Sequence, residues 1–300
     1  MRLMLTRRRF AVMVGSVLAG SLIAYSSIAS AANENGEGLL EKLVEIEERL
    51  DARIGVAVLD TQTGRRWEHR ADERFPMTST FKALACGAVL ARVDAGEEEL
   101  DRRIRIEASD IVTYSPVTEN HVGGEGMTLG ELCEATITTS DNTAGNLILE
   151  TLGGPSGVTE FARSLGDSMT RLDRWETELN EATPGDPRDT TTPNAMVANL
   201  RSLVVGDALS QQSRDQLTAW LVANQTGDEK LRAGLPNDWR IGDKTGGGNH
   251  GTTNDVAVIW PPGREPLIVS VYITQTEASV DDRNAAIAEI GRAIYVALAI

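Results

Sequence analysis

The sequence predicts an α/β fold in which a sheet layer is built from both ends of the chain and a helical segment is inserted between them. Three observations support this prediction. Strand patterns occur near the N-terminus, at 54–69, and again near the C-terminus, at 239–276. Helix patterns flank these strands at 39–53 and 281–300. The stretch between, about 76–222, is dominated by helical periodicity, so we expect a cleft where the two parts meet.

Length and composition fit an ordinary globular protein without a metal centre. The chain has 300 residues, of which 41% are hydrophobic and 24% charged, enough for one large domain or two closely packed ones. Its three histidines, His69, His121 and His250, are isolated from one another. No pair has the spacing of metal ligands, so we expect no zinc site and no cofactor.

The first 31 residues have the features of an export signal. Four arginines precede an apolar run at Phe10–Tyr25, which is short for a transmembrane span. Ala29-Ser30-Ala31 fits the small-residue rule for cleavage, so we expect a mature protein that starts at Ala32 and is periplasmic or secreted. Thr6-Arg7-Arg8-Arg9-Phe10 is typical of twin-arginine signals. An ordinary arginine-rich signal peptide and an uncleaved anchor are the alternatives.

Removal of that signal would leave a strongly acidic chain. It would carry 25 basic and 44 acidic residues, a formal net charge of −19. Such a charge disfavours binding to nucleic acid or to anionic membranes. A source that lives in high salt and a merely soluble acidic secreted protein explain the charge equally well.

The N-terminal elements follow from periodicity. Leu39–Arg53 places apolar residues on one stripe and predicts an amphipathic helix. Ile54–Asp60 predicts a strand, Thr61–Gly64 a turn and Arg65–His69 its hairpin partner. These elements form the N-terminal share of the sheet layer.

The helix after Pro76 begins with a pair of chemical interest. Its start contains Ser79-x-x-Lys82, and its apolar pattern ends near Asp94-Ala95-Gly96. Residues three apart share a helix face, so the serine hydroxyl and the lysine amine would be within reach of each other. The hydroxyl would also lie near the positive end of the helix dipole. Such a lysine can activate a serine as a nucleophile, although S-x-x-K alone occurs by chance in many proteins.

The helical middle contains two polar interruptions. Thr128-Leu129-Gly130-Glu131 has the capping-box pattern and opens a helix through about Thr138. Ser140-Asp141-Asn142 separates it from a second helix at Thr143–Leu152, which ends at a glycine pair. Arg174–Asp189 has no clean period and opposite charges at its ends, which predicts a compact Ω-loop closed by an ion pair. Further helices are expected at Pro193–Val205 and Ser210–Val222.

The C-terminal part returns to strands and closes with a helix. Strands are expected at Trp239–Thr245, Thr252–Pro261 and Pro266–Thr276, and the helix at Asp281–Ile300. The run Gly246–Gly251 matches the G-x-G-x-x-G pattern of dinucleotide-binding proteins, but that function requires a helix next. Because a strand follows, we expect a hairpin turn.

Four motifs in order make the chain resemble a known family. They are Ser79-x-x-Lys82, Ser140-Asp141-Asn142, Trp175-Glu176-Thr177-Glu178-Leu179-Asn180 and Lys244-Thr245-Gly246. The first, second and fourth of these motifs occur in both class A β-lactamases and penicillin-binding proteins. With the Glu176 motif added, the chain resembles the class A enzymes over essentially all of its mature length. The resemblance implies an antiparallel five-stranded sheet flanked by helices, an all-helical subdomain and an active site in the cleft between them. One catalytic domain would span 32–300, with its α/β part at about 32–75 and 223–300.

The resemblance also implies the chemistry of acyl transfer. Ser79 would attack the lactam carbonyl, with its own N–H and that of Gly247 as the oxyanion hole. Lys82 and Ser140 would relay a proton to the departing nitrogen. Glu176 would activate the water that releases the acyl group, a contribution of roughly 10²–10⁴-fold. Whether Glu176 or Lys82 takes the Ser79 proton during acylation stays open.

Substrate binding would fall to the surrounding residues. Lys244 and Thr245 would hold the substrate carboxylate, a task for a fixed cation plus a hydroxyl. Outside such motifs a lone loop glutamate or strand lysine is usually solvated, and Asn142 could simply cap the following helix. The motifs favour roles in the site. Asn142 would orient Lys82 and the substrate amide, and Asn180 would help to hold the hydrolytic water.

Three further residues would complete the binding site. Tyr114 would form an aromatic wall, Gly246 belongs to the strand motif, and Lys230 would lie near the substrate carboxylate.

Several positions depart from the family pattern. Thr253 stands where many relatives have an arginine that helps to bind the carboxylate, and Lys230 is the matching helix cation here. A lysine lacks the planar fork of arginine, so carboxylate handling is expected to differ. Thr78 stands where carbapenem-hydrolysing relatives often have a cysteine, and Gly248 replaces its partner. We therefore expect turnover of penicillins and early cephalosporins with little turnover of carbapenems.

Cys86 and Cys133 are the only cysteines in the chain. Export permits a disulfide, and two buried free thiols are the alternative. Some family members carry a disulfide at these positions, so the resemblance favours the pair. It would close a loop of about 48 residues and contribute up to roughly 4 kcal/mol.

Two rival functions share part of the motif set. A D,D-peptidase that acts on cell-wall stem peptides would lack the Glu176 loop. A β-lactam sensor would stop at the acyl-ester and carry transmembrane helices. We therefore predict a β-lactamase that gives antibiotic resistance, that binds β-lactams and no nucleic acid, and that is a monomer without stable membrane insertion after signal cleavage.

Overall fold

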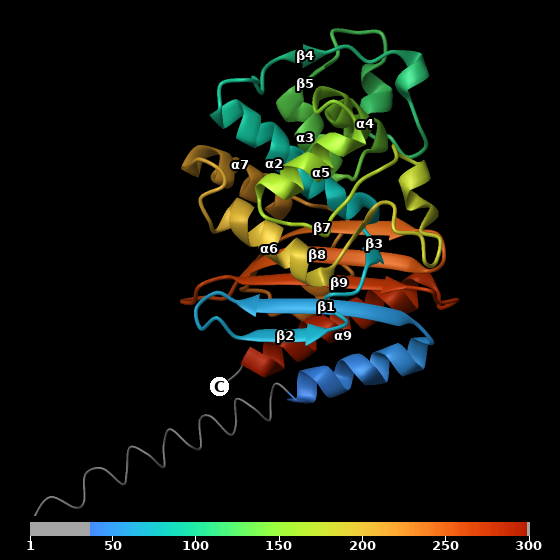
Figure 1. Cartoon of the computed structure of the whole chain (residues 1–300), viewed down its shortest axis with the longest axis vertical. Helices are drawn as coiled ribbons and strands as arrows, with labels where there is room; N and C mark the ends of the chain where they lie inside the picture. Colours follow the sequence, from blue (N-terminus) through green and yellow to red (C-terminus); the bar gives the residue numbers. More distant parts are fainter. Residues whose placement is uncertain (1–36, 299–300) are drawn as a thin grey trace, which may run out of the picture.

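A five-stranded antiparallel sheet is the centre of the computed structural model, which describes residues 37–298 (Figure 1). The strand order is β2-β1-β9-β8-β7. The predicted sheet built from both chain ends is therefore confirmed, whereas the expected export signal lies outside the described residues. The strands are β1 (Arg53–Asp60), β2 (Arg66–His69), β7 (Arg240–Gly248), β8 (Thr252–Trp260) and β9 (Leu267–Thr274).

Helices cover both faces of the sheet, so its central strands are buried on both sides. Every residue of β9 is buried, and its register with β1 runs from Arg53↔Thr274 to Asp60↔Leu267. One face packs against the N-terminal helix (residues 37–50) and α9 (Val280–Leu298). Such two-sided burial explains why these strands read as nearly continuous apolar runs.

The helical part packs on the opposite face, beyond β7 in Figure 1. Its centre is α2 (Phe81–Asp94), whose residues from Phe81 to Leu90 are all buried. The helical middle was predicted, except for α5 (Pro155–Ser164). The glycine pair before Pro155 ends one helix, but the proline occupies the first turn of the next, where its fixed φ is favourable. The other helices of this part are α3 (Leu129–Thr138), α4 (Asn142–Thr151), α6 (Pro193–Val204) and α7 (Gln211–Val222). The short helix α8 (Leu231–Gly234) lies outside it and packs against α9.

Local sequence signals set several element boundaries. The predicted capping box at the start of α3 is present, with the Glu131 N–H on Thr128 Oγ1 at 3.1 Å and the Thr128 N–H on Glu131 Oε2 at 2.7 Å. The predicted hairpin between β7 and β8 is also present, but β7 continues to Gly248, which pairs with Thr252. The ladder therefore extends through the glycine run. Two short pairings were not predicted, β3 (Phe75–Pro76) with β6 (Thr190–Thr191) and β4 (Arg103–Ile104) with β5 (Met127–Thr128).

Within residues 37–298, no helix combines the length and the hydrophobicity that are needed to cross a bilayer. The same residues contain no cluster of histidine, cysteine or acidic side chains suited to a metal ion.

Candidate active site

The N-terminal end of α2 places Ser79 and Lys82 between the sheet and the helical part. Ser79 lies in η1 (Thr78–Thr80), a single 3₁₀ turn that leads into α2. Asn254 of β8 fixes this turn, because its amide donates to the carbonyl oxygen of Met77 at 3.1 Å and to Thr78 Oγ1 at 3.0 Å. The sequence motifs did not identify Asn254, whose role depends on the contact between strand and turn.

Lys82 is completely buried and fully hydrogen-bonded. Its Nζ donates to Asn142 Oδ1 at 2.7 Å and to the carbonyl oxygen of Ser140 at 2.9 Å. It also forms an ion pair with Glu176 Oε1 at 3.0 Å. Three acceptors thus surround the three N–H donors of an ammonium group, which makes burial of the charge tolerable.

Glu176 connects the two residues of the first motif. Its Oε1 accepts from Ser79 Oγ at 3.3 Å and contacts Lys82, while its Oε2 accepts from Asn180 Nδ2 at 2.5 Å. Asn146 clamps the Glu176 backbone from both sides, accepting from its N–H and donating to its carbonyl oxygen, each at 2.9 Å. Sequence reasoning missed Asn146. Its position one helical turn after Asn142, on the same face of α4, was the available signal.

The Ω-loop that presents Glu176 is closed at its two ends. Arg174 Nε lies 2.6 Å from Asp189 Oδ2, so the expected ion pair is present. Asp189 Oδ1 also accepts the backbone N–H groups of Asp173 and Arg174, at 2.7 and 2.9 Å. The peptide bond between Glu176 and Thr177 is cis. The buried Asp189 therefore holds the base of the loop through both backbone and side-chain contacts.

Ser140 and Lys244 come from opposite parts of the molecule and are in contact at the junction of the helical part and the sheet, here called the cleft. Lys244 Nζ donates to Ser140 Oγ at 3.0 Å and to the carbonyl oxygen of Thr245 at 2.9 Å. Ser140 has a φ of 62°, a conformation that is uncommon for residues other than glycine. Burial, together with the positive charge of Lys82, lowers the pKa of Lys244 to about 7.

Asp141 and Asn142 fix the loop between α3 and α4. The Asp141 carboxylate caps α4 by accepting the Ala144 N–H at 2.8 Å, and it also accepts from Thr118. The Asn142 amide donates to the carbonyl oxygen of Thr113 at 2.8 Å while its Oδ1 holds Lys82. Asp141 is therefore the helix cap, and Asn142 is free to contact the site. The neighbouring Tyr114 is 57% exposed.

The glycine run at the end of β7 lets this edge strand approach its neighbours. A Cβ atom on Gly246 would lie 2.2 Å from Thr78 Oγ1, and one on Gly248 would lie 2.7 Å from the carbonyl oxygen of Asn180. On Gly247 it would meet nothing closer than 4.0 Å. Glycine is thus required sterically at the first two positions, and space remains beside Gly247.

Lys230 lies beside the strand edge and not on the central cluster. Its Nζ is 3.4 Å from the carbonyl oxygen of Thr226, whose hydroxyl contacts the hydroxyl of Thr245. Thr253 is engaged by Arg283, whose Nε donates to Thr253 Oγ1 at 2.8 Å. Sequence reasoning did not identify Thr226 or Arg283 as neighbours of the site.

Cys86 and Cys133 are neighbours in the buried core but are not bonded. Both are free thiols, and Cys86 Sγ lies 3.8 Å from the carbonyl oxygen of Cys133. Burial raises the pKa of the Cys86 thiol well above its usual value, which keeps it protonated. The predicted disulfide is therefore not formed in this structure, which has the two buried thiols of the alternative interpretation.

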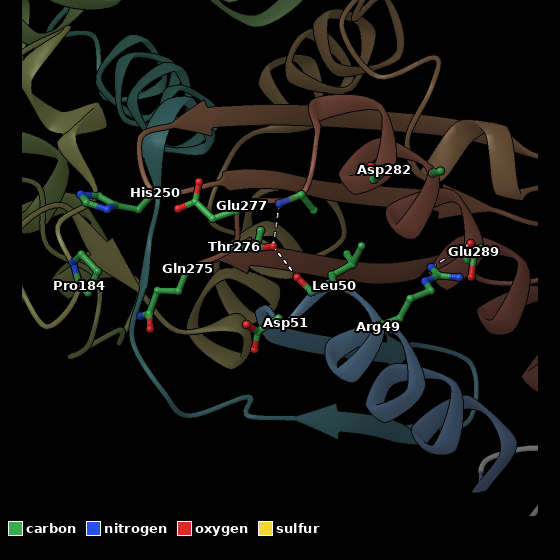
Figure 2. Close-up of a pocket in the computed structure, with 12 residues that line it drawn as sticks. Arg49, Leu50, Asp51, Pro184, His250, Gln275, Thr276, Glu277, Asp282 and Glu289 are labelled. Carbon is green, nitrogen blue, oxygen red and sulfur yellow. Dashed lines mark hydrogen bonds and ion pairs between the residues drawn. The ribbon is translucent and has the colours of Figure 1, made fainter.

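A cavity of about 740 Å³ lies away from these residues, between the end of the N-terminal helix and the start of α9 (Figure 2). Two of its charged side chains, Arg49 and Glu289, form an ion pair at 3.0 Å. Thr276 Oγ1 donates to the carbonyl oxygen of Leu50 at 2.5 Å. None of the predicted catalytic residues lines this cavity.

Comparisons with known proteins agree with this geometry. A sequence model described as the β-lactamase enzyme family matches residues 39–298. Beta-lactamase AST-1 of Nocardia asteroides is 55% identical over 257 residues, which cover 86% of this chain and 83% of that protein. Beta-lactamase AER-1 of Aeromonas hydrophila is 47% identical over 95% of this chain and 93% of its own length. A solved ancestral class A β-lactamase is 67% identical, with a TM-score of 0.84 over 86% of this chain and 98% of its own.

Proposed function

The chain belongs to the class A β-lactamases, and we propose that it hydrolyses penicillins and early cephalosporins through an acyl-enzyme on Ser79. Hydrolysis of β-lactams, and the antibiotic resistance that follows from it, is the activity that its relatives support. The observation that carries the mechanism is the position of Glu176 Oε1, which contacts both Ser79 Oγ and Lys82 Nζ. A nucleophile, a carboxylate and an ammonium group thus share one buried site.

Acylation begins when Ser79 Oγ attacks the lactam carbonyl carbon and transfers its proton to the Glu176–Lys82 pair. The N–H groups of Ser79 and Gly247 stabilise the oxyanion, and the loss of one such donor typically costs about 3–4 kcal/mol in the transition state. The C–N bond of the ring then breaks, and the nitrogen takes a proton from Ser140 Oγ. Lys82 lies against the Ser140 backbone at 2.9 Å, which favours resupply of that proton.

Deacylation requires a water between the ester and Glu176. Asn180 donates to Glu176 Oε2 and would orient this water together with the carboxylate. Glu176 takes one proton as the hydroxide adds to the ester carbonyl, and the collapse of the intermediate returns the proton to Ser79 Oγ. The buried carboxylate therefore distinguishes a turnover enzyme from a protein that stays acylated.

The β7 edge and the opposite rim would bind the substrate. Lys244 and Thr245 would hold the carboxylate, with Lys230 as a nearby second cation. Asn142 would accept the side-chain amide, Tyr114 would form the outer wall, and Gly246 keeps the strand close to η1. Thr78 and Gly248 pack tightly here, and we infer little carbapenem turnover from the residues at these two positions.

The proposal includes the organisation of the chain. Residues 1–31 would be a signal of the twin-arginine type, and 32–300 one catalytic domain whose helical part is about 76–222. The mature protein would be a periplasmic or secreted monomer.

The test compares nitrocefin turnover by the wild-type protein and by Ser79→Ala, beside release of terminal D-alanine from a cell-wall stem peptide. Catalytic nitrocefin hydrolysis that is lost in Ser79→Ala, without D-alanine release, is expected. Stem-peptide cleavage without β-lactam turnover would instead identify a D,D-peptidase.

A further inference from the structure

Two completely buried carboxyl groups lie behind the strand that carries the cleft lysine. Asp243 directly precedes Lys244 on β7, and Asp255 on β8 is the cross-strand partner of Thr245. Side chains alternate between faces along a strand, so the side chain of Asp243 points away from that of Lys244. The contacts agree, because Lys244 reaches Ser140 on one face whereas Asp243 reaches Arg232 on the other.

The two acids differ in how their oxygens are satisfied. Asp243 Oδ1 accepts from Arg232 Nε at 2.7 Å, and its Oδ2 accepts from Asn224 Nδ2 at 2.8 Å. Asp255 Oδ2 accepts only the Leu231 N–H, at 3.2 Å, and its Oδ1 has no partner among the described residues. A buried carboxylate with an orphan oxygen is costly, so its presence needs a reason.

On the other face of β7, Lys244 is a buried cation without an adjacent carboxylate in the described part of the chain. Its ammonium donates to two neutral oxygens, and no carboxylate in residues 37–298 lies within ion-pair distance of it. The Glu176 carboxylate is already bound by Lys82, which is itself a second positive charge. The groups on the face of β7 that carries Lys244 therefore compensate its positive charge poorly.

We propose that Asp243 and Asp255 are positioning residues that keep Lys244 charged from behind the strand. Lys230 and Arg232 complete the arrangement, because their positive charges favour the ionised form of Asp255 against the burial that disfavours it. The proposal deepens the proposed function and rests on the role of Lys244 as the anchor of the substrate carboxylate. It also gives Lys230 a second role, that of a counter-ion to Asp255.

The charges that act on Lys244 have the required signs. Burial and Lys82 lower the pKa of Lys244, whereas Asp243, Glu176 and Asp255 raise it. Burial raises the pKa of Asp255 well above its usual value, and Asp243 raises it further. Lys230 and Arg232 lower the pKa of Asp255. The facing groups thus come from α2, the Ω-loop, β7, β8 and the segment that begins α8.

The test is the pH dependence of kcat/KM for benzylpenicillin with Asp255→Asn, which keeps the shape and removes the charge. Without that charge Lys244 loses its proton at lower pH, so the alkaline limb should shift down by about one pH unit. At pH 5, where Lys244 is mostly protonated in both proteins, kcat/KM should change little. NMR titration of the Lys244 ε-methylene group should show the same shift without any turnover.

Two further variants separate this role from a structural one. Lys230→Met should shift the limb in the same direction as Asp255→Asn, and the double variant should shift it no further. Asp60→Asn is the matched control, because Asp60 is also a buried strand acid paired with an arginine, Arg264 at 3.0 Å, but is not among the charges that act on Lys244. The alkaline limb of its pH profile for kcat/KM should not shift.

A folded Asp255→Asn protein with an unmoved limb and an unmoved NMR titration would overturn the proposal while leaving the hydrolase intact. If Asp255→Asn does not fold, an unmoved limb in Lys230→Met overturns it in the same way. A wild-type protein without β-lactam turnover would instead remove the proposed function itself, whatever Lys244 does in the titration.

Discussion

The cleft and the packing layer on the far face of the sheet are built by opposite rules. In the far layer, side chains such as Leu43, Ile54 and Ile287 are fully buried and apolar. In the cleft, Lys82 and Lys244 are just as deeply buried, and Glu176 is nearly so. Apolar burial stabilises a fold by roughly 25 cal/mol per Å². Burial of charges costs desolvation energy that their attraction seldom exceeds.

The backbone shows the same difference. Strand β1 and its partner β9 form an unbroken ladder across the far layer. Around the cleft, Tyr114 and Ser140 have positive φ angles of 64° and 62°. Such conformations typically cost about 1–3 kcal/mol each when the residue is not glycine. We infer that apolar packing in the far layer stabilises the fold and offsets the cost of the buried charges and positive φ angles in the cleft.

The largest expected effect comes from removing the buried ion pair. In Lys82→Met/Glu176→Gln, both charges go together, so neither is left unpaired. We expect kcat/KM to fall at least about a thousandfold, since the proton-transfer groups are lost. Urea unfolding should show little loss of stability, because the desolvation cost of two buried charges is removed together with their attraction.

The control for that variant is the exposed pair Lys42–Glu45, changed to Met and Gln in the same way. It should alter neither kcat/KM nor the urea midpoint appreciably. A large loss of stability in the buried double variant alone would break the comparison, since the cleft pair would then support the fold.

The next effect is on stability and comes from the far layer. Ile287→Ala removes a fully buried side chain of α9, and we expect a loss of about 2–5 kcal/mol in the free energy of unfolding. At 25 °C kcat/KM should stay within a factor of two of the wild type. Val296→Ala, at a position of the same helix that is 56% exposed, is the control and should change little. Reduced kcat/KM in folded Ile287→Ala would show that the two regions are coupled.

The smallest effect is expected at the base of the Ω-loop, where structure and chemistry meet. Asp189→Asn retains the shape but weakens the bond to Arg174 and two backbone contacts. A looser loop would hold Glu176 less firmly, so we expect kcat to fall about tenfold. Asp186→Asn in the same loop, which breaks the exposed pair with Arg188, should leave kcat unchanged. Equal kcat values for the two variants would contradict this role of Asp189.

The difference between the far layer and the cleft also explains which parts of the structure could be predicted from the sequence. Periodicity predicted the sheet, because strands such as β9 carry the apolar runs that two-sided burial requires. It predicted the α3 start, because a capping box is a local signal. It missed α5, which begins directly after a glycine pair, and the extension of β7 through glycines, which depends on pairing with β8.

The site was predictable only where the motifs are local. Ser79, Lys82, Ser140 and Lys244 lie in recognisable motifs, and the structure brings them together. Their geometry was not predictable, because Ser79 and Lys82 meet through Glu176, nearly a hundred residues away. Asn146 and Asn254 belong to no motif and hold Glu176 and η1 through contacts between distant elements.

Intact-mass analysis of Glu176→Ala during reaction with benzylpenicillin tests the central claim most directly. The account predicts a penicilloyl adduct on Ser79 that accumulates and decays at least about a hundredfold more slowly than in the wild-type protein. The wild-type protein should turn over the same substrate without a lasting adduct. A stable adduct on the wild-type protein, or none on Glu176→Ala, would contradict it.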